Sequence, residues 1–431
     1  LNSYLTLSAE EAIRSAKAAE EAVMRGDWLP PLHGVPIAIK DLEATKGIRT
    51  TAGSLVFEDR IPEEDSIVVG RIKDAGAIIL GKTNTPEFGL LAITENRLGD
   101  HCRNPWDTNY SAGGSSGGSA ASVSAGLCSL AVGSDGGGSI RIPASFCGVY
   151  GIKPTQGRVP RYSGAAMPIV ANQFSQSGPM TRTVRDSALL LQVLGGYDSR
   201  DVSSLRKPCP DFLKAACEDI NGLKVGWSPD FGHAVVEPEI VEIVFRAAKV
   251  FEELGCSLDS SDLTFESQFE VFWTLFSANN YAIFGHLLKE DRDKLTWYVS
   301  DCLEYGSKVS GSEYSRAIGQ LNWLETQFAK QFERYDLLLS PTMATDTCLV
   351  DGYPKEIAGS ETESIGVYTP FTFPINMVGY PAASIPCGFL SNGLPVGLQI
   401  IGRKGDESTV IAASAAFELA KPWIHQKPLV S

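Results

Sequence analysis

The sequence has no long uninterrupted apolar run, and this absence limits where the protein can act. No stretch reaches the roughly 18 apolar residues that a membrane-spanning helix needs. The chain opens on Leu1-Asn2-Ser3, without the basic segment and apolar core of a secretory signal peptide, which indicates a truncated start. We therefore expect a cytoplasmic protein with no membrane contact.

Positive charge is also scarce. The chain carries 37 Lys and Arg residues against 51 Asp and Glu residues, a formal net charge of −14. Such a chain repels phosphate backbones and anionic lipid, and no cluster of basic residues offsets the repulsion. We expect a small molecule as substrate and no nucleic acid as partner. The sequence leaves a homodimer open.

Histidine and cysteine do not form metal-binding patterns. The five histidines lie at positions 33, 101, 233, 286 and 425, and none is three to five residues from another. The nine cysteines are scattered and include no Cys-x-x-Cys pair, so they are expected to be reduced and mostly buried. We predict neither a metal nor a cofactor.

What is present suits a globular enzyme, because 43% of the 431 residues are hydrophobic and they are spread along the chain. Apolar spacing predicts a helix over residues 8–25 and a buried strand over 35–39 that ends at Lys40. A second predicted helix, 63–75, leads into a strand-like run at 77–80. Strand, helix and strand in this order are typical of a parallel α/β layer. Further strand-like runs occur at 127–132, 337–339 and 383–385.

Three short segments could carry chemistry. Gly136-Gly137-Gly138 precedes Ser139, which places several backbone N–H groups near one hydroxyl, as acyl transfer requires. A second segment, residues 113–119, is rich in glycine and serine, and Lys40 ends a strand. Taken singly, the triple glycine is more typical of a tight loop and Lys40 of a surface lysine, whereas the glycine- and serine-rich segment is equally typical of a flexible linker.

Together they lie in longer stretches that resemble the amidase signature family. The matching stretches are GVPIAIKDLEATKGIRTTAGS (34–54), GKTNTPEFG (81–89), NPWDTNYSAGGSSGGSAASVSAG (104–126), GSDGGGSIRIPASFCGVYGIKPTQGRVP (133–160) and FPINMVGYPAASIPCGFLSNGLPVGLQIIG (373–402). The likeness spans most of the chain outside about 199–330. Family members usually carry a further helical stretch before the position that is residue 1 here.

The resemblance implies a fold and a set of roles. The fold would be an α/β/α single domain over residues 1–431, with a large mixed sheet and a helical region at about 199–330 covering the site. Ser139 would be the nucleophile, Ser115 the bridging serine and Lys40 the base. Backbone N–H groups across Gly136, Gly137, Gly138 and Ser139 would form the oxyanion hole. The peptide bond between Gly114 and Ser115 would be cis.

Proton chemistry sets one condition on this relay. A serine hydroxyl needs a base to take its proton, and a lysine is a base only when it is neutral. The pKa of Lys40 must therefore be lowered by burial, which the apolar run before it can provide.

Two other motifs compete. Residues 76–83 match the phosphate-loop pattern GxxxxGK[ST], but Ala-Ile-Ile-Leu within them reads as a strand, so we reject ATP binding. Residues 113–117 match GxSxG, the nucleophile elbow of α/β-hydrolases, which would need a downstream histidine such as His233, His286 or His425. An inactive scaffold is disfavoured because all three catalytic positions are filled.

Within the family, the main alternative is the catalytic component of a glutamine-hydrolysing amidotransferase. Such a protein resembles this chain but holds glutamine with an acidic residue and an arginine, whose places fall here at Thr369 and near Leu321-Asn322. Residues 265–298 are rich in aromatics, some of which are expected to line the substrate funnel. We therefore predict cleavage of small apolar or aryl amides, with carbamates and esters reachable by the same chemistry.

Overall fold

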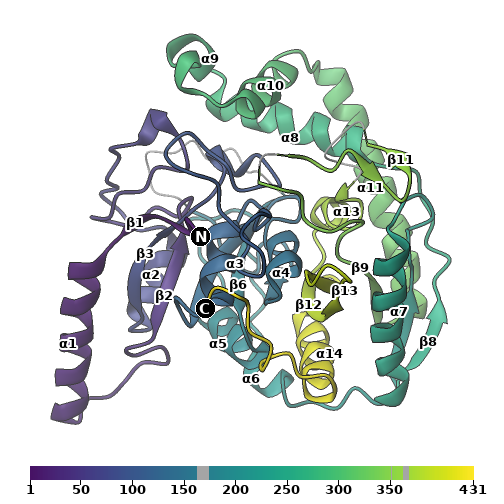
Figure 1. The fold of residues 1–431 in the computed structure, drawn as a ribbon, viewed down its shortest axis with the longest axis horizontal. Helices are drawn as coiled ribbons and strands as arrows, with labels where there is room; N and C mark the ends of the chain where they lie inside the picture. Colours follow the sequence, from purple (N-terminus) through teal and green to yellow (C-terminus); the bar gives the residue numbers. More distant parts are fainter. Residues whose placement is uncertain (163–173, 351, 363–367) are drawn as a thin grey trace.

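The centre of the computed structural model, which describes residues 1–162, 174–350, 352–362 and 368–431, is an 11-stranded mixed sheet (Figure 1). Its strand order is β1-β3-β2-β4-β6-β5-β12-β13-β9-β7-β8. Strands β2, β3 and β4 run parallel at one end and β7, β8 and β9 at the other, while the pairs between them are antiparallel. The strands are β1 (Tyr4–Leu7), β2 (Pro36–Lys40), β3 (Ile78–Thr83), β4 (Leu130–Asp135), β5 (Tyr150–Lys153), β6 (Gln176–Thr181), β7 (Lys224–Trp227), β8 (Ser257–Ser260), β9 (Leu337–Pro341), β12 (Ala382–Phe389) and β13 (Pro395–Gly402), with β10 (Glu356–Ile357) and β11 (Ser360–Glu361) forming a separate pair.

Helices cover both faces of the sheet, and each face has its own apolar core. One face packs against α2 (Ile67–Asp74), α5 (Val184–Leu194), α6 (Phe212–Ala215), α7 (Pro238–Glu253) and α14 (Glu407–Ala420). The other packs against α3 (Gly117–Ser124), α4 (Arg141–Cys147), α8 (Phe269–Phe284), α9 (Leu287–Glu290), α10 (Trp297–Gly306), α11 (Gly311–Arg334) and α13 (Phe373–Val378). Helix α1 (Ala9–Arg25) lies at the outer end of the molecule, next to β3 (Figure 1). The described residues also form three short 3-10 turns: η1 (Leu55–Phe57), η2 (Glu87–Gly89) and η3 (Arg292–Lys294).

The alternation of side chains along β2 determines the face of the sheet on which Lys40, its last residue, lies. Ile37 and Ile39 belong to the core shared with α2 and α5, whereas Ala38 belongs to the core shared with α3 and α4. Side chains alternate along a strand, so Lys40 shares the face of Ala38. The strand therefore delivers Lys40 to the side of the sheet that carries α3 and α4.

The sequence-based fold prediction is confirmed. The predicted helix over 8–25 is α1, which ends where Gly26 adopts a left-handed conformation with φ of 73°. The predicted strands at 35–39 and 77–80 are β2 and β3, and they pair in parallel. Because β3 continues through Thr83, the GxxxxGK[ST] match lies in a strand and has no phosphate-binding turn.

The helices that could cover the site occupy a shorter part of the chain than the predicted range of about 199–330. Within residues 199–330, β7 and β8 extend the sheet and α7 packs on the face opposite α3 and α4. The helices that lie over the other face begin at Phe269 with α8. Strands β7 and β8 are four residues each, which is too short for their apolar pattern to stand out in the sequence.

Candidate active site

Lys40 is fully buried at the end of β2 and points at two serines. Its Nζ lies 2.6 Å from Ser115 Oγ and 3.0 Å from Ser134 Oγ, and it also donates to the Ser134 carbonyl at 3.3 Å. Burial lowers the pKa of Lys40 to about 7, although the negative charges of Asp135 and Glu43 act in the opposite direction. A substantial fraction of Lys40 is therefore neutral near pH 7, which a base requires.

Ser115 lies in the glycine-rich turn before α3. The Gly114–Ser115 peptide bond is cis, as the resemblance implies. Gly114 has no room for a side chain, because an added Cβ would lie 2.7 Å from the backbone carbon of Ile93. Ser115 is only 2% exposed, and this close packing holds its hydroxyl against Lys40.

Ser139 follows the three glycines in the loop that joins β4 to α4. The Asp135 carboxylate accepts hydrogen bonds from the backbone N–H groups of Gly138 at 2.7 Å and Ile140 at 3.2 Å. On the other side of the loop, Thr372 Oγ1 donates to the Gly137 carbonyl at 2.8 Å. The loop is thus fixed before any substrate arrives, as an oxyanion hole must be.

One predicted oxyanion donor is engaged elsewhere. Since the Gly138 N–H donates to Asp135, it does not point its hydrogen at a substrate carbonyl. Within the described part of the chain, the N–H groups of Gly136, Gly137 and Ser139 donate no hydrogen bond. The set of available donors is therefore these three.

Asp135 itself is held by Arg141. The Arg141 guanidinium binds both carboxylate oxygens, with Nε 2.9 Å from Oδ2 and Nη2 3.0 Å from Oδ1, and both side chains are fully buried. Burial, the largest single cause, would raise the pKa of Asp135, but the charge and hydrogen bonds of Arg141, the charge of Lys153 and the hydrogen bond from Asn376 together lower it to about 2. Arg141 also donates to Gln399 Oε1 at 2.7 Å and Asn376 Oδ1 at 2.6 Å. Asp135 therefore stays ionised and keeps the loop in place.

Removing this cation should destabilise the protein strongly. We expect Arg141→Gln to lower the free energy of unfolding by about 3–5 kcal/mol, because it leaves a buried carboxylate without its charge partner. Arg246→Gln is the matched control: Arg246 pairs with Glu242 at 3.0 Å on the exposed side of α7, and its loss should cost no more than about 0.5 kcal/mol. Denaturant unfolding of both variants measures the difference. Equal losses would contradict a structural role for the Arg141–Asp135 pair.

Ser115 and Ser139 line one cavity of about 140 Å³. Their segments are joined by a hydrogen bond from the Ser116 N–H to the Ser139 carbonyl at 3.1 Å. Among the described residues the two hydroxyls form no hydrogen bond with each other. Catalytic hydrogen bonds of unliganded enzymes commonly tighten only when substrate binds.

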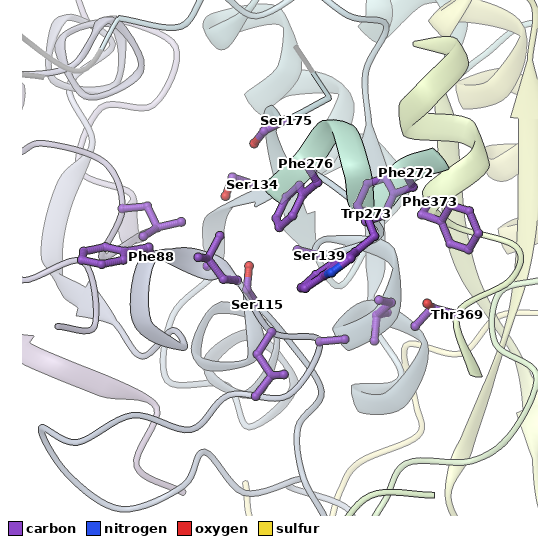
Figure 2. Close-up of a pocket in the computed structure, with 18 of the residues that line it drawn as sticks. Phe88, Ser115, Ser134, Ser139, Ser175, Phe272, Trp273, Phe276, Thr369 and Phe373 are labelled. Carbon is purple, nitrogen blue, oxygen red and sulfur yellow. The ribbon is translucent and has the colours of Figure 1, made fainter. Parts of the chain in front are cut away.

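Aromatic rings form one wall of this cavity. Phe272, Trp273 and Phe276 of α8 lie to one side of Ser139 together with Phe373 of α13, and Phe88 lies beyond Ser115 (Figure 2). Phe269 also lines the cavity. The prediction that a subset of the 265–298 aromatics lines the funnel is confirmed, and the subset is the one on α8. An apolar cavity of roughly 150 Å³ can hold a benzene ring, so this cavity of about 140 Å³, whose other walls are polar, has a volume of that order.

The cavity also has a charged wall that the sequence analysis missed. Glu43 and Arg161 both line it, and Thr369, at the predicted place of an acidic residue, lines it as a neutral side chain. Leu321 packs against the core that contains α8 and α11. The acidic residue and the arginine expected to bind glutamine are absent at their predicted places. One carboxylate, Glu43, and one cation, Arg161, reach the cavity from other segments. Only the position of Glu43 three residues after Lys40 could have hinted at this.

The competing nucleophile elbow lacks the histidine that it would need. None of the five histidines is among the residues that line the cavity. His233 lies in a separate surface depression with Phe265 and Trp323. Over the described ranges, no group of three His, Cys, Asp or Glu side chains is placed to hold a metal ion, and no helix is long and apolar enough to cross a membrane.

Comparison with known proteins agrees with this geometry. Residues 1–411 match the family described as Amidase. A glutamyl-tRNA(Gln) amidotransferase component of Moorella thermoacetica is 40% identical, with 99% of this chain and 91% of that protein covered. The acylamidase of Rhodococcus erythropolis is 36% identical, with 99% and 90% covered. The crystal structure of a bacterial aryl acylamidase of the amidase signature family superimposes with a TM-score of 0.90 at 34% identity, covering 98% of this chain and 90% of that one.

Proposed function

This chain belongs to the amidase family of amide-hydrolysing enzymes, and from that premise we propose that it cleaves small apolar or aryl amides through an acyl-enzyme on Ser139. The observation that carries the proposal is the buried Lys40 at 2.6 Å from Ser115, which lines the same cavity as Ser139 and the α8 aromatics. Carbamates and esters are within reach of the same site, because their carbonyl groups form a similar tetrahedral intermediate. We further propose that the enzyme acts in the cytoplasm on a small-molecule substrate, and a homodimer stays a prediction.

The proposed mechanism begins with proton removal. As Ser139 Oγ attacks the carbonyl carbon, its proton passes to Ser115 Oγ while the Ser115 proton passes to neutral Lys40 Nζ. The carbonyl oxygen takes up the negative charge and receives hydrogen bonds from the N–H groups of Gly136, Gly137 and Ser139. Each such donor is worth roughly 3 kcal/mol in the transition state.

Collapse of the intermediate reverses the proton path. The C–N bond breaks, and the departing amine takes a proton from Ser115, which Lys40 replenishes. Water then attacks the acyl-enzyme, gives its proton to the same relay, and releases the carboxylic acid and free Ser139. The relay returns to its starting protonation state, so no further proton donor is needed.

Substrate preference tests the proposal. We expect kcat/KM for a small nitroanilide to exceed that for glutamine by about 70-fold, since covering about 100 Å² of ring against the α8 wall is worth roughly 2.5 kcal/mol. An aryl carbamate should also be turned over. All three are measured with the purified protein.

A glutamine-hydrolysing role is the second candidate, favoured by the 40% identity to an amidotransferase component and by the presence of both charge signs in the cavity. Glutamine turnover equal to that of the nitroanilide would establish this candidate and refute the aryl preference. Little turnover of either, with the carbamate hydrolysed, would move the proposed substrate class to carbamates.

The pH dependence follows from the pKa of Lys40. Its protonated form is inactive as a base, so kcat/KM should rise from pH 5, pass a midpoint near the pKa of about 7 and level off above pH 8. Lys153 is a second buried lysine whose pKa burial lowers to about 7, so Lys153→Met is the control and should keep the midpoint. If the midpoint disappears in Lys153→Met, the rise of kcat/KM with pH reports the titration of Lys153 and not that of Lys40.

A further inference from the structure

Glu43 is a largely buried carboxylate on the cavity wall with an unused acceptor. The residue is 9% exposed and lines the cavity beside Ser134 and Ser139. Its Oε1 accepts a hydrogen bond from Ser177 Oγ at 2.6 Å. Its Oε2 accepts none from any residue that the structure describes. This oxygen is not among the fully enclosed atoms of the described residues, so it is open to a hydrogen-bond donor that a ligand in the cavity could bring.

The sheet places this carboxylate next to the proposed relay. Ser177 on β6 is the register partner of Ser134 on β4. Directly opposite residues of an antiparallel pair have Cβ atoms about 4.5–5.5 Å apart on the same face. Ser134 Oγ is in turn 3.0 Å from Lys40 Nζ. The Glu43 carboxylate therefore lies against β6, across β4 from the strand that carries Lys40.

The cations near Glu43 are occupied with other acceptors. Lys82 donates to Thr45 Oγ1 at 2.8 Å and to the backbone carbonyl of Glu43 rather than to its carboxylate. Arg161 donates to the Ser175 carbonyl at 3.0 Å and lies on the same wall. The aromatic rings of α8 form another part of the lining. A ligand that fits this cavity would carry an aromatic ring and, close to its carbonyl, a hydrogen-bond donor.

We propose that Glu43 binds an amino or ammonium group of the substrate, so that the preferred substrates are aromatic amides with an amino group on the carbon next to the scissile carbonyl. This inference rests on the proposed function and specifies its substrate class. Phenylalaninamide is the simplest member of that class. The ring would contact Phe272 and Phe276 while the amino group donates to Glu43 Oε2.

Three amides that differ at one carbon test the assignment. They are 3-phenylpropanamide, phenylalaninamide, which adds an ammonium group, and benzylmalonamate, which adds a carboxylate. At pH 7, where most of an α-amino group is protonated, wild-type kcat/KM should be at least about tenfold higher for phenylalaninamide than for 3-phenylpropanamide. Glu43→Gln should lower this ratio about tenfold. Any effect of the substitution on the chemistry itself cancels in the ratio.

Matched variants and a binding readout separate the possible failures. Thr369→Val, which alters a neutral residue of the same cavity, should leave the ratio within about twofold. Calorimetric Kd values for the same amides with Ser139→Ala protein should show the same preference without turnover. A ratio near one in the wild type, an unchanged ratio in Glu43→Gln, or a preference for benzylmalonamate would each overturn the proposal, the last in favour of Arg161. If none of the amides is hydrolysed, the Kd ratio still decides on Glu43, and only the proposed function fails.

Discussion

Ser139→Ala is expected to abolish both turnover and covalent labelling by a fluorophosphonate. The reagent reacts with a serine only where a base and oxyanion donors meet, and Ser139 directly follows the glycines whose N–H groups donate no hydrogen bond within the described residues, Gly136 and Gly137. Loss of a nucleophile removes the acyl-enzyme route, so kcat/KM should fall by at least roughly 10⁴-fold. Peptide mapping of the labelled wild type identifies the residue.

Ser175→Ala is the control for this experiment. Ser175 also lines the cavity, but its hydroxyl has no buried base beside it, so the variant should keep both the label and most of the activity. A label on Ser115 or Ser116 instead of Ser139 would favour the GxSxG motif as a nucleophile elbow. It would also leave the triple-glycine loop without a catalytic role.

The fold could be predicted where strands are buried on both faces. Residues 35–39 and 77–80 are continuous apolar runs because helices cover both sides of β2 and β3, and such runs stand out in a sequence. Strands β7 and β8 did not stand out. Each has only four residues, and β8 at the sheet edge is mostly exposed, so neither shows a hydrophobic period.

The site could be predicted where close backbone approach demands glycine. The glycines beside Ser115 and Ser139 are required because a Cβ at Gly114 or Gly138 would collide with Ile93 or Thr372. Glycines that are required for this reason can be recognised in the sequence. Glu43 and Arg161 meet in the cavity only because β2, β6 and the segments around them come together in the sheet. No local pattern announces a contact of that kind.

The sequence could not show that the Gly138 N–H donates its hydrogen bond to Asp135 and not to a substrate. Three glycines in a row predict a cluster of donors, but which of them faces a substrate depends on where the chain places its acceptors. Here Asp135 takes the Gly138 hydrogen, and Arg141 fixes Asp135 in the position to do so. The same motif without that carboxylate would present a different set of N–H groups.

Lys40→Met is expected to lower kcat/KM by at least about 10³-fold, because it keeps the volume of the side chain and removes the base. Lys40→Arg should fail as completely, although it restores a cation with hydrogen-bond donors. A guanidinium keeps its proton at every accessible pH and cannot accept one from Ser115. This pair distinguishes a base from a residue that merely holds Ser115 by a hydrogen bond.

Ser115→Ala completes the test, since it interrupts the relay but leaves Lys40 neutral in its apolar setting. Water in the space of the lost hydroxyl can carry the proton less well, so a small residue of activity should remain, above that of Lys40→Met. Its pH profile should keep a midpoint near 7, because burial still sets the pKa of Lys40. Near-ultraviolet circular dichroism checks that each variant is folded. Activity of Lys40→Met or Lys40→Arg within tenfold of the wild type would show that Ser139 receives its activation from another group.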